Sequence, residues 1–151
     1  MYQRVADWNK NCCKTPKVFN SDEYWTSLEY QLSRVEEELH ETRLAIENRD
    51  LNEVLDGGID MDVTVAGFNY LAGFNYPEES EKVLRNNDLK YTKFEYHIYD
   101  TLEVNEWSLD DYEIKVSPER LLSIHRKSDD KIMKLLNHPK VKLDAGELNG
   151  E

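Results

Sequence analysis

The sequence has only two cysteines, and these are direct neighbours, Cys12 and Cys13. Two adjacent thiols make neither a disulfide framework nor a zinc knuckle, so we expect both to stay reduced in a cytoplasm. The sequence also lacks a positively charged start followed by an apolar run, and no stretch approaches the roughly 18 apolar residues of a membrane span. These absences predict a soluble, cytoplasmic protein with no membrane partner.

Positive charge is also scarce: 19 Lys and Arg residues stand against 31 Asp and Glu residues, which gives a net charge of −12. A protein of this charge repels phosphate backbones and anionic lipid heads. We therefore expect no nucleic-acid partner, and a nuclease activity is disfavoured. A single small anion remains compatible with the charge, because a divalent cation reverses the local field where carboxylates converge.

A chain of 151 residues is long enough for one ordinary domain and too short for two. We therefore expect one domain over residues 1–143. Residues 144–151 are polar and include Gly146 and Gly150, so they predict a flexible tail.

Apolar residues recur at steps of three and four through most of the first hundred residues, which is the pattern of amphipathic helices. Ser21 or Asp22 is placed to cap the longest of these helices, and Asp50 with Glu53 has the form of a cap for the next one. The predicted helices cover residues 2–12, 25–48, 51–70, 77–85 and 94–106.

The remaining residues follow a different pattern. Residues 107–119 predict irregular structure, whereas residues 121–126 alternate in polarity and are followed by the turn residues Ser128, Asp129 and Asp130. We therefore predict a mainly α fold, an antiparallel bundle of four to five helices with a small C-terminal β-hairpin.

Carboxylates gather on the two longest predicted helices. Glu41 lies three and four residues after Glu38 and Glu37, so a helix places it on one face with both. Asp56 and Asp60 are four residues apart on the next helix, beside its apolar stripe of residues 55, 59 and 63, which should face the core. A tight turn makes the two helices antiparallel neighbours, so the acidic groups can face each other. Oxygen ligands without thiol or imidazole favour Mg²⁺ or Mn²⁺.

Plainer explanations exist for these features. In a chain with 33% charged residues, the run Glu36–Glu38 is equally consistent with the solvated face of an acidic helix. Gly57 and Gly58 each cost a helix roughly 1 kcal/mol relative to alanine. They indicate close approach by a ligand or another chain, or equally a bend or tight packing.

The run VEEELHETRLAIENRDLNEVLDGGIDMDVTVAG, residues 35–67, resembles the core of the all-α nucleoside triphosphate pyrophosphohydrolases. This superfamily includes MazG-like proteins, phosphoribosyl-ATP pyrophosphohydrolases and dimeric dUTPases. Its pattern is EExxE, a spacer, and an acidic helix motif ExxD. The residues that match are Glu37, Glu38 and Glu41 in the first motif and Asp60 in the second.

One position departs from the family pattern. Gly57 stands where the second motif has its glutamate, so Asp56 or water would replace that ligand. A second register takes Glu53 and Asp56 as a literal ExxD. We prefer Asp56 and Asp60, because the apolar run after Asp60 is closer to the family.

The similarity extends over roughly residues 28 to 136 and includes basic residues of the second half. VLRNNDLKY resembles the family's NxxK pair, and RKSDDKIMK resembles the SDGK-bearing hairpin of phage-encoded members. The resemblance implies substrate contacts from Asn87, Lys90, Lys127 and Lys131, with Lys134 as a further phosphate contact. For each residue alone, an ordinary surface lysine or helix-terminal asparagine is the plainer explanation.

The resemblance implies a metal-dependent hydrolase that acts on a (deoxy)nucleoside triphosphate, such as the purine dNTP dGTP. Water attacks the α-phosphate, and the products are the monophosphate and pyrophosphate. The implied cofactor is Mg²⁺ or Mn²⁺, and the implied assembly is a dimer or tetramer, in the host cytoplasm if the gene is phage-borne. The implied catalytic residues are Glu37, Glu38, Glu41 and Asp60, and the implied metal ligands are Glu38, Glu41, Asp56 and Asp60.

The sequence allows alternatives for the residues that contact the base and for the function itself. Trp8, Asn9 and Trp25 could read a base by stacking and hydrogen bonding, although core packing is the plainer use of both tryptophans. A catalytically inactive helical adaptor or metal-stabilised binding module is the alternative function, and the glycine at position 57 makes it conceivable.

Overall fold

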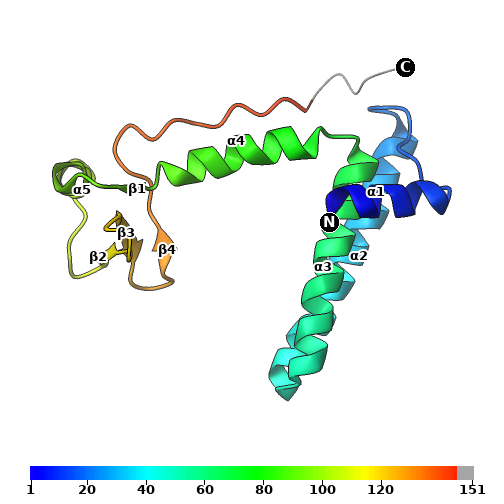
Figure 1. Ribbon diagram of the computed structural model, residues 1–151, viewed down its shortest axis with the longest axis horizontal. Coiled ribbons are helices and arrows are strands. Elements are labelled where there is room, and N and C mark those ends of the chain that lie inside the picture. Colours follow the sequence, from blue (N-terminus) through cyan, green and yellow to red (C-terminus); the bar gives the residue numbers. More distant parts are fainter. Residues whose placement is uncertain (146–151) are drawn as a thin grey trace. The chain divides into compact units, whose positions relative to one another are not determined.

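The structure is a computed structural model that describes residues 1–145 (Figure 1). These residues form five helices and one small antiparallel sheet, so the predicted mainly α class is confirmed. They divide into two compact units, one of residues 1–76 with Ala145 and one of residues 77–144. Residues 146–151 of the predicted tail lie outside the described residues. No helix within residues 1–145 has the length and apolar character needed to cross a membrane.

The first unit contains α1 (Tyr2–Asn11), α2 (Asp22–Asn48) and α3 (Leu51–Ala72). Figure 1 shows α2 and α3 side by side as a long antiparallel hairpin, and α1 packs against α3. The predicted caps are present: the Tyr24 amide donates to Ser21 Oγ, and the Asp50 side chain accepts from the amides of residues 52 and 53. Arg49 ends α2 in the left-handed conformation, so the connection is as tight as predicted.

The core of this unit lies at the open end of the hairpin. Tyr24 and Leu28 from the start of α2 are buried against Leu71 and Ala72 from the end of α3. The Tyr24 hydroxyl donates a hydrogen bond of 3.0 Å to the Ala72 carbonyl, which satisfies the one polar atom of this side chain.

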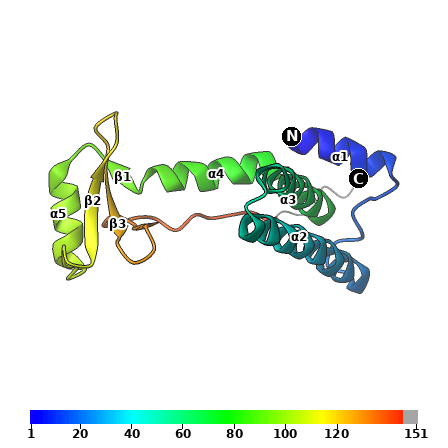
Figure 2. The same ribbon diagram turned by 90° about the horizontal axis from the view of Figure 1, so that it is seen from below.

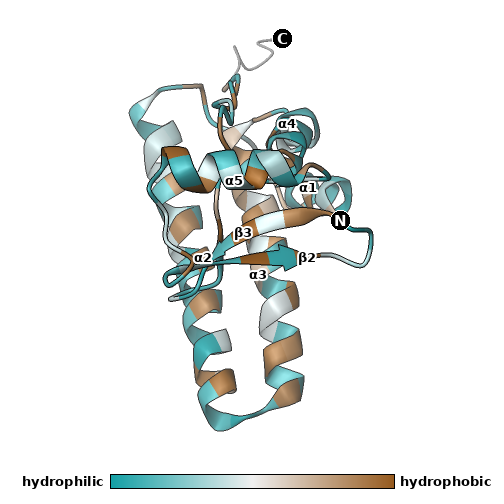
Figure 3. Ribbon diagram, turned by 90° about the vertical axis from the view of Figure 1, so that its left-hand side faces the viewer, coloured by the Kyte–Doolittle hydropathy of each residue, from teal (hydrophilic) through white to brown (hydrophobic). Residues whose placement is uncertain are grey.

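Toward the turn of the hairpin, the apolar stripes are exposed instead of buried. Leu39 and Ile46 on α2 are 47% and 59% exposed, and Leu55 and Ile59 on α3 are 65% and 46% exposed. Figure 3 shows the corresponding apolar segments along both helices. The expectation that the Leu55 and Ile59 stripe faces a core was therefore wrong for the single chain, because two helices alone offer too little surface to cover it.

Close packing between α2 and α3 accounts for one of the two adjacent glycines. A Cβ atom at Gly57 would lie 2.3 Å from Thr42 Oγ1 and 3.2 Å from Thr42 Cβ. A Cβ atom at Gly58 would have no atom within 4 Å. Tight helix packing therefore explains Gly57, and no comparable contact explains Gly58.

The two glycines should respond in opposite ways to alanine. Gly58→Ala should raise the free energy of unfolding by about 0.5–1 kcal/mol, because alanine favours the helix and meets no neighbour. Gly57→Ala should lower it by about 1–3 kcal/mol, because the added methyl group overpacks the contact with Thr42. Urea denaturation of both variants measures the two changes in the free energy of unfolding. Destabilisation of equal size at both positions would contradict the packing described here.

The second unit contains α4 (Tyr76–Asp88, from Pro77 onward), β1 (Tyr91–Thr92), α5 (Glu95–Val104), β2 (Tyr112–Val116), β3 (Leu122–Arg126) and β4 (Lys131–Ile132). Strand β3 pairs antiparallel with each of the other three strands. Figure 2 shows α5 alongside this sheet. The core joins Ile98 and Leu102 of α5 to Ile124 of β3 and to Leu135.

The second half differs from the sequence prediction in two respects. Residues 107–119 were expected to be irregular, and this was wrong for β2, whose residues alternate in polarity from Tyr112 to Val116. An alternation of five residues is long enough to indicate a half-buried strand, and the prediction overlooked it. The sheet is also larger than one hairpin, since β1 and β2 both pair with β3. A single bundle of four to five helices stays a prediction.

Candidate functional site

Carboxylates from α2 and α3 share one neighbourhood in the middle of the helical hairpin. The pKa of Glu38 is raised above its usual value, first because the carboxyl group is partly removed from water. The negative charges of Asp60, Glu41 and Glu37 raise it further, and Arg34 offsets part of this effect. Asp60 of α3 therefore lies near enough to Glu38 of α2 for its charge to act on that carboxyl group, which brings one residue of the second acidic pair beside the first motif.

The composition of this group suits a hard divalent cation, because every donor is a carboxylate oxygen. Within residues 1–145, no three acidic, histidine or cysteine side chains are already placed to hold one metal ion together. Glu37 and Glu41 are exposed, and the Glu37 carboxylate accepts a hydrogen bond from Arg34.

Asp56 and Gly57 lie one helical turn closer to the hairpin turn than Asp60. Asp56 is exposed, and it is not among the charges that raise the pKa of Glu38. Gly57 faces α2, but Thr42 occupies the space that a glutamate side chain would need there. The structure thus places Asp60 with the first motif, and Asp56 as a metal ligand stays a prediction.

A cavity of about 310 Å³ opens beside the carboxylates. Residues from three helices and from the loop after α1 line it, and the positively charged ones are Lys14 and Arg34. Gly67 leaves room for a side-chain amide, since a Cβ atom there would lie 3.1 Å from Gln31 Nε2. The lining residues are Trp8, Asn9, Lys14, Gln31, Arg34, Glu37, Glu38, Glu41, Val63, Thr64 and Gly67.

Two of the three candidate base-reading residues line this cavity. Trp8 is 54% exposed, and the Lys14 ammonium lies 5.4 Å from the centre of its ring. Asn9 is buried and donates through Nδ2 to the Val5 carbonyl at 2.9 Å. Trp25 lies elsewhere, is 53% exposed, and donates its indole N–H to Asn20. Core packing was therefore the wrong explanation for both tryptophans.

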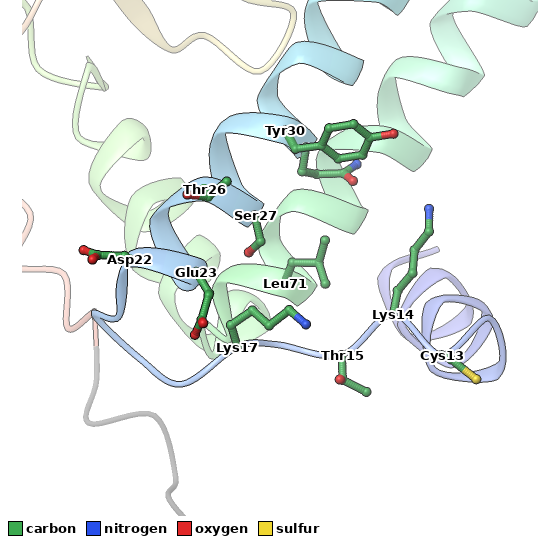
Figure 4. Close-up of a pocket in the computed structure, with 11 residues that line it drawn as sticks. Cys13, Lys14, Thr15, Lys17, Asp22, Glu23, Thr26, Ser27, Tyr30 and Leu71 are labelled. Atoms are coloured by element: carbon green, nitrogen blue, oxygen red, sulfur yellow. The ribbon is translucent and has the colours of Figure 1, made fainter.

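A larger cavity of about 590 Å³ adjoins the first, because Lys14 and Gln31 line both (Figure 4). Its walls are the loop from Cys13 to Lys17, the first turns of α2 with Tyr30, and Leu71 of α3. The sequence prediction missed Lys14, Lys17 and Gln31. Lys14 and Lys17 flank Pro16 and lie next to an acidic helix in an acidic chain, and this pattern could have indicated both lysines.

The predicted substrate contacts of the second half all belong to the second unit. The Lys90 amide donates to the Asn87 carbonyl at 3.0 Å, which is the turn that follows α4. Lys127 donates through Nζ to the Leu109 carbonyl at 2.7 Å. Lys131 on β4 and Lys134 after it are exposed. Their roles toward a substrate stay predictions.

Searches against protein-family models, curated proteins and solved structures found no match for this chain.

Proposed function

We propose that the protein is a metal-dependent nucleoside triphosphate pyrophosphohydrolase that releases a monophosphate and pyrophosphate. The observation that supports this best is that Glu37, Glu41 and Asp60, from two helices, act on Glu38, where their charges add to burial in raising the pKa. A triphosphate carries too much negative charge to approach such a group alone. A hard cation held by these carboxylates resolves that conflict.

Glu38, Glu41 and Asp60 are the proposed ligands of Mg²⁺ or Mn²⁺, with Asp56 as the fourth candidate. When bound, the cation neutralises phosphate charge and makes a water molecule easier to deprotonate. Glu37 lines the cavity and is placed to accept that proton or to complete the ligand set. Water then attacks the α-phosphorus, and pyrophosphate leaves.

The surrounding side chains supply the remaining contacts with the nucleotide. Lys14 and Arg34 are the cations of the cavity, so they are our candidates for the β- and γ-phosphates. Trp8 offers an exposed ring face on which a base can stack. A purine such as that of dGTP makes the largest stacking contact, and we therefore keep a purine dNTP as the preferred substrate. Asn87, Lys90, Lys127 and Lys131 remain proposed substrate contacts.

A dimer or tetramer is part of this proposal. The exposed stripes of α2 and α3 near the hairpin turn require a partner surface, and a second copy of the same hairpin would complete the predicted helical bundle. The proposed location is the cytoplasm, which supplies both Mg²⁺ and nucleotides and keeps Cys12 and Cys13 reduced. With a net charge of −12, no nucleic-acid partner is proposed.

One observation favours an alternative, a helical adaptor or metal-stabilised module without turnover. Gly57 stands where the similar family has a glutamate, and Thr42 fills the space beside it. The adaptor would bind metal and gain stability but form no product.

A product assay separates the two functions. The protein is incubated with each common NTP and dNTP plus Mg²⁺ or Mn²⁺, and ion-exchange chromatography resolves the nucleotides. The enzyme forms a monophosphate and pyrophosphate only with metal, and Glu41→Gln removes this activity. Glu36→Gln, which changes an exposed neighbour outside the cavity, keeps it. Intact triphosphates throughout, together with metal-dependent stabilisation, would instead favour the adaptor.

A further inference from the structure

A hydrogen-bonded chain of three polar side chains lies on the sheet of the second unit. Ser123 Oγ is 2.9 Å from His125 Nε2, and His125 Nδ1 is 2.8 Å from Asp130 Oδ1. Ser123 and His125 are two residues apart on β3, so they share one face of the sheet. Ile124 between them is fully buried on the opposite face, in the core with α5.

The partners of Asp130 fix the protonation pattern along this chain. Hydrogen bonds from Lys115, at 2.5 Å, and from His125 lower the pKa of Asp130 below its usual value, so it remains a carboxylate. A carboxylate only accepts hydrogen bonds, so His125 donates through Nδ1. Nε2 then carries the free electron pair, and it accepts the proton of the Ser123 hydroxyl. The His125 side chain is only 12% exposed, which limits competition from water for this bond.

We propose that Ser123 is an activated nucleophile that takes acyl groups from short-chain carboxylic esters, with His125 as its general base. Asp130 is a positioning residue that holds the imidazole in the reactive tautomer. These residues belong to the second unit and line neither cavity of the carboxylate site. The proposal is therefore independent of nucleotide hydrolysis.

The neighbouring strands favour a short acyl chain. Tyr91 on β1 and Lys115 on β2 are the register partners of Ser123, so a ring and a lysine stem flank the hydroxyl group on either side. Side chains this close on both sides favour a short acyl group, such as acetyl, over a long one.

The reaction is balanced without any co-reactant except water. Ser123 Oγ forms a bond to the ester carbonyl carbon, and its proton moves to His125 Nε2. The ester C–O bond then breaks, and the alcohol leaves with that proton. Water adds to the acyl-serine with His125 again as base, which releases the carboxylic acid and restores the Ser123 hydroxyl.

The test uses the full chain and a phosphonofluoridate probe, which forms a P–O bond to an activated serine and loses fluoride. Mass spectrometry of digested protein locates the label, and 4-nitrophenyl acetate reports turnover. We expect the label on Ser123 in the wild type and no label at this position in Ser123→Ala. His125→Gln should label at least about 100-fold more slowly, which is the usual loss of a general base. Ser128→Ala, in the adjacent turn, should label like the wild type.

A second comparison separates catalysis from a merely structural network. Circular dichroism first shows that each variant is folded. Asp130→Asn should slow labelling because an amide no longer selects the reactive tautomer, and Asp130→Glu should restore part of the rate. An unlabelled Ser123 in the folded wild type would overturn the proposal. Labelling of His125→Gln at the wild-type rate would overturn it equally.

Discussion

Asp60→Asn should reduce the turnover of the preferred triphosphate by about 100-fold or more. Asp60 is the α3 carboxylate whose charge acts on Glu38, so its replacement removes the main ligand that α3 offers to the proposed cation. Removing one group that helps to stabilise transition-state charge typically lowers the rate by about 10² to 10³, and Asp60 would act in this way through the cation that it holds. Steady-state kinetics at saturating Mg²⁺ or Mn²⁺ measure the loss in kcat.

Two neighbouring aspartates on α3 serve as matched comparisons for this loss. Asp62 is exposed and lines neither cavity, so Asp62→Asn should keep the wild-type rate. Asp56 lies one turn away from Asp60 and is exposed, so Asp56→Asn should cost less than Asp60→Asn. A larger loss in Asp56→Asn than in Asp60→Asn would show that the second register, with Glu53 and Asp56, is the functional one.

Mg²⁺ or Mn²⁺ should stabilise the wild-type protein, by about 2.7 kcal/mol at a concentration 100 times the dissociation constant. The cation would offset the negative charges that, in addition to burial, raise the pKa of Glu38. Thermal denaturation with and without metal measures the gain, with Ca²⁺ as a further cation and excess chelator as the reference. Asp60→Asn should lose most of this gain. An equal metal effect in wild type and Asp60→Asn would place the cation elsewhere.

Without metal, Glu38→Gln should change the stability of the protein in a way that depends on pH. The folded protein disfavours the charged Glu38, so its ionisation lowers stability at neutral pH, and the penalty disappears at pH values below the pKa of the unfolded chain. The variant should therefore be more stable than the wild type at pH 7, by about 0.2–0.5 kcal/mol, the scale of a like-charge pair on a helix. The difference should close at low pH.

Local sequence signals predicted the scaffold of the site well. Ser21 and Asp50 cap helices as their side-chain chemistry requires, and the short link at Arg49 makes α2 and α3 antiparallel. Once that pairing is known, helical spacing brings Glu38 opposite Asp60. These features depend on contacts within a few residues or across one tight turn, which a single sequence contains.

Features that depend on distant packing were not predictable in this way. Lys14 joins the site only because α1 packs on α3 and carries the following loop toward the carboxylates. The contact between Gly57 and Thr42 requires the register of two helices, which the apolar pattern alone does not fix. The sequence indicated Asp130 only as a turn residue. Its hydrogen bond to His125 depends on how β3 and β4 pair.

The position of bond cleavage tests the central claim most directly. The preferred dNTP is hydrolysed in H₂¹⁸O with Mg²⁺, and mass spectrometry locates the heavy oxygen in the products. Water attack at the α-phosphorus predicts one ¹⁸O in the monophosphate and none in the pyrophosphate. Release of inorganic phosphate, or ¹⁸O in the pyrophosphate, would contradict the account, and so would a rate that Asp60→Asn leaves unchanged.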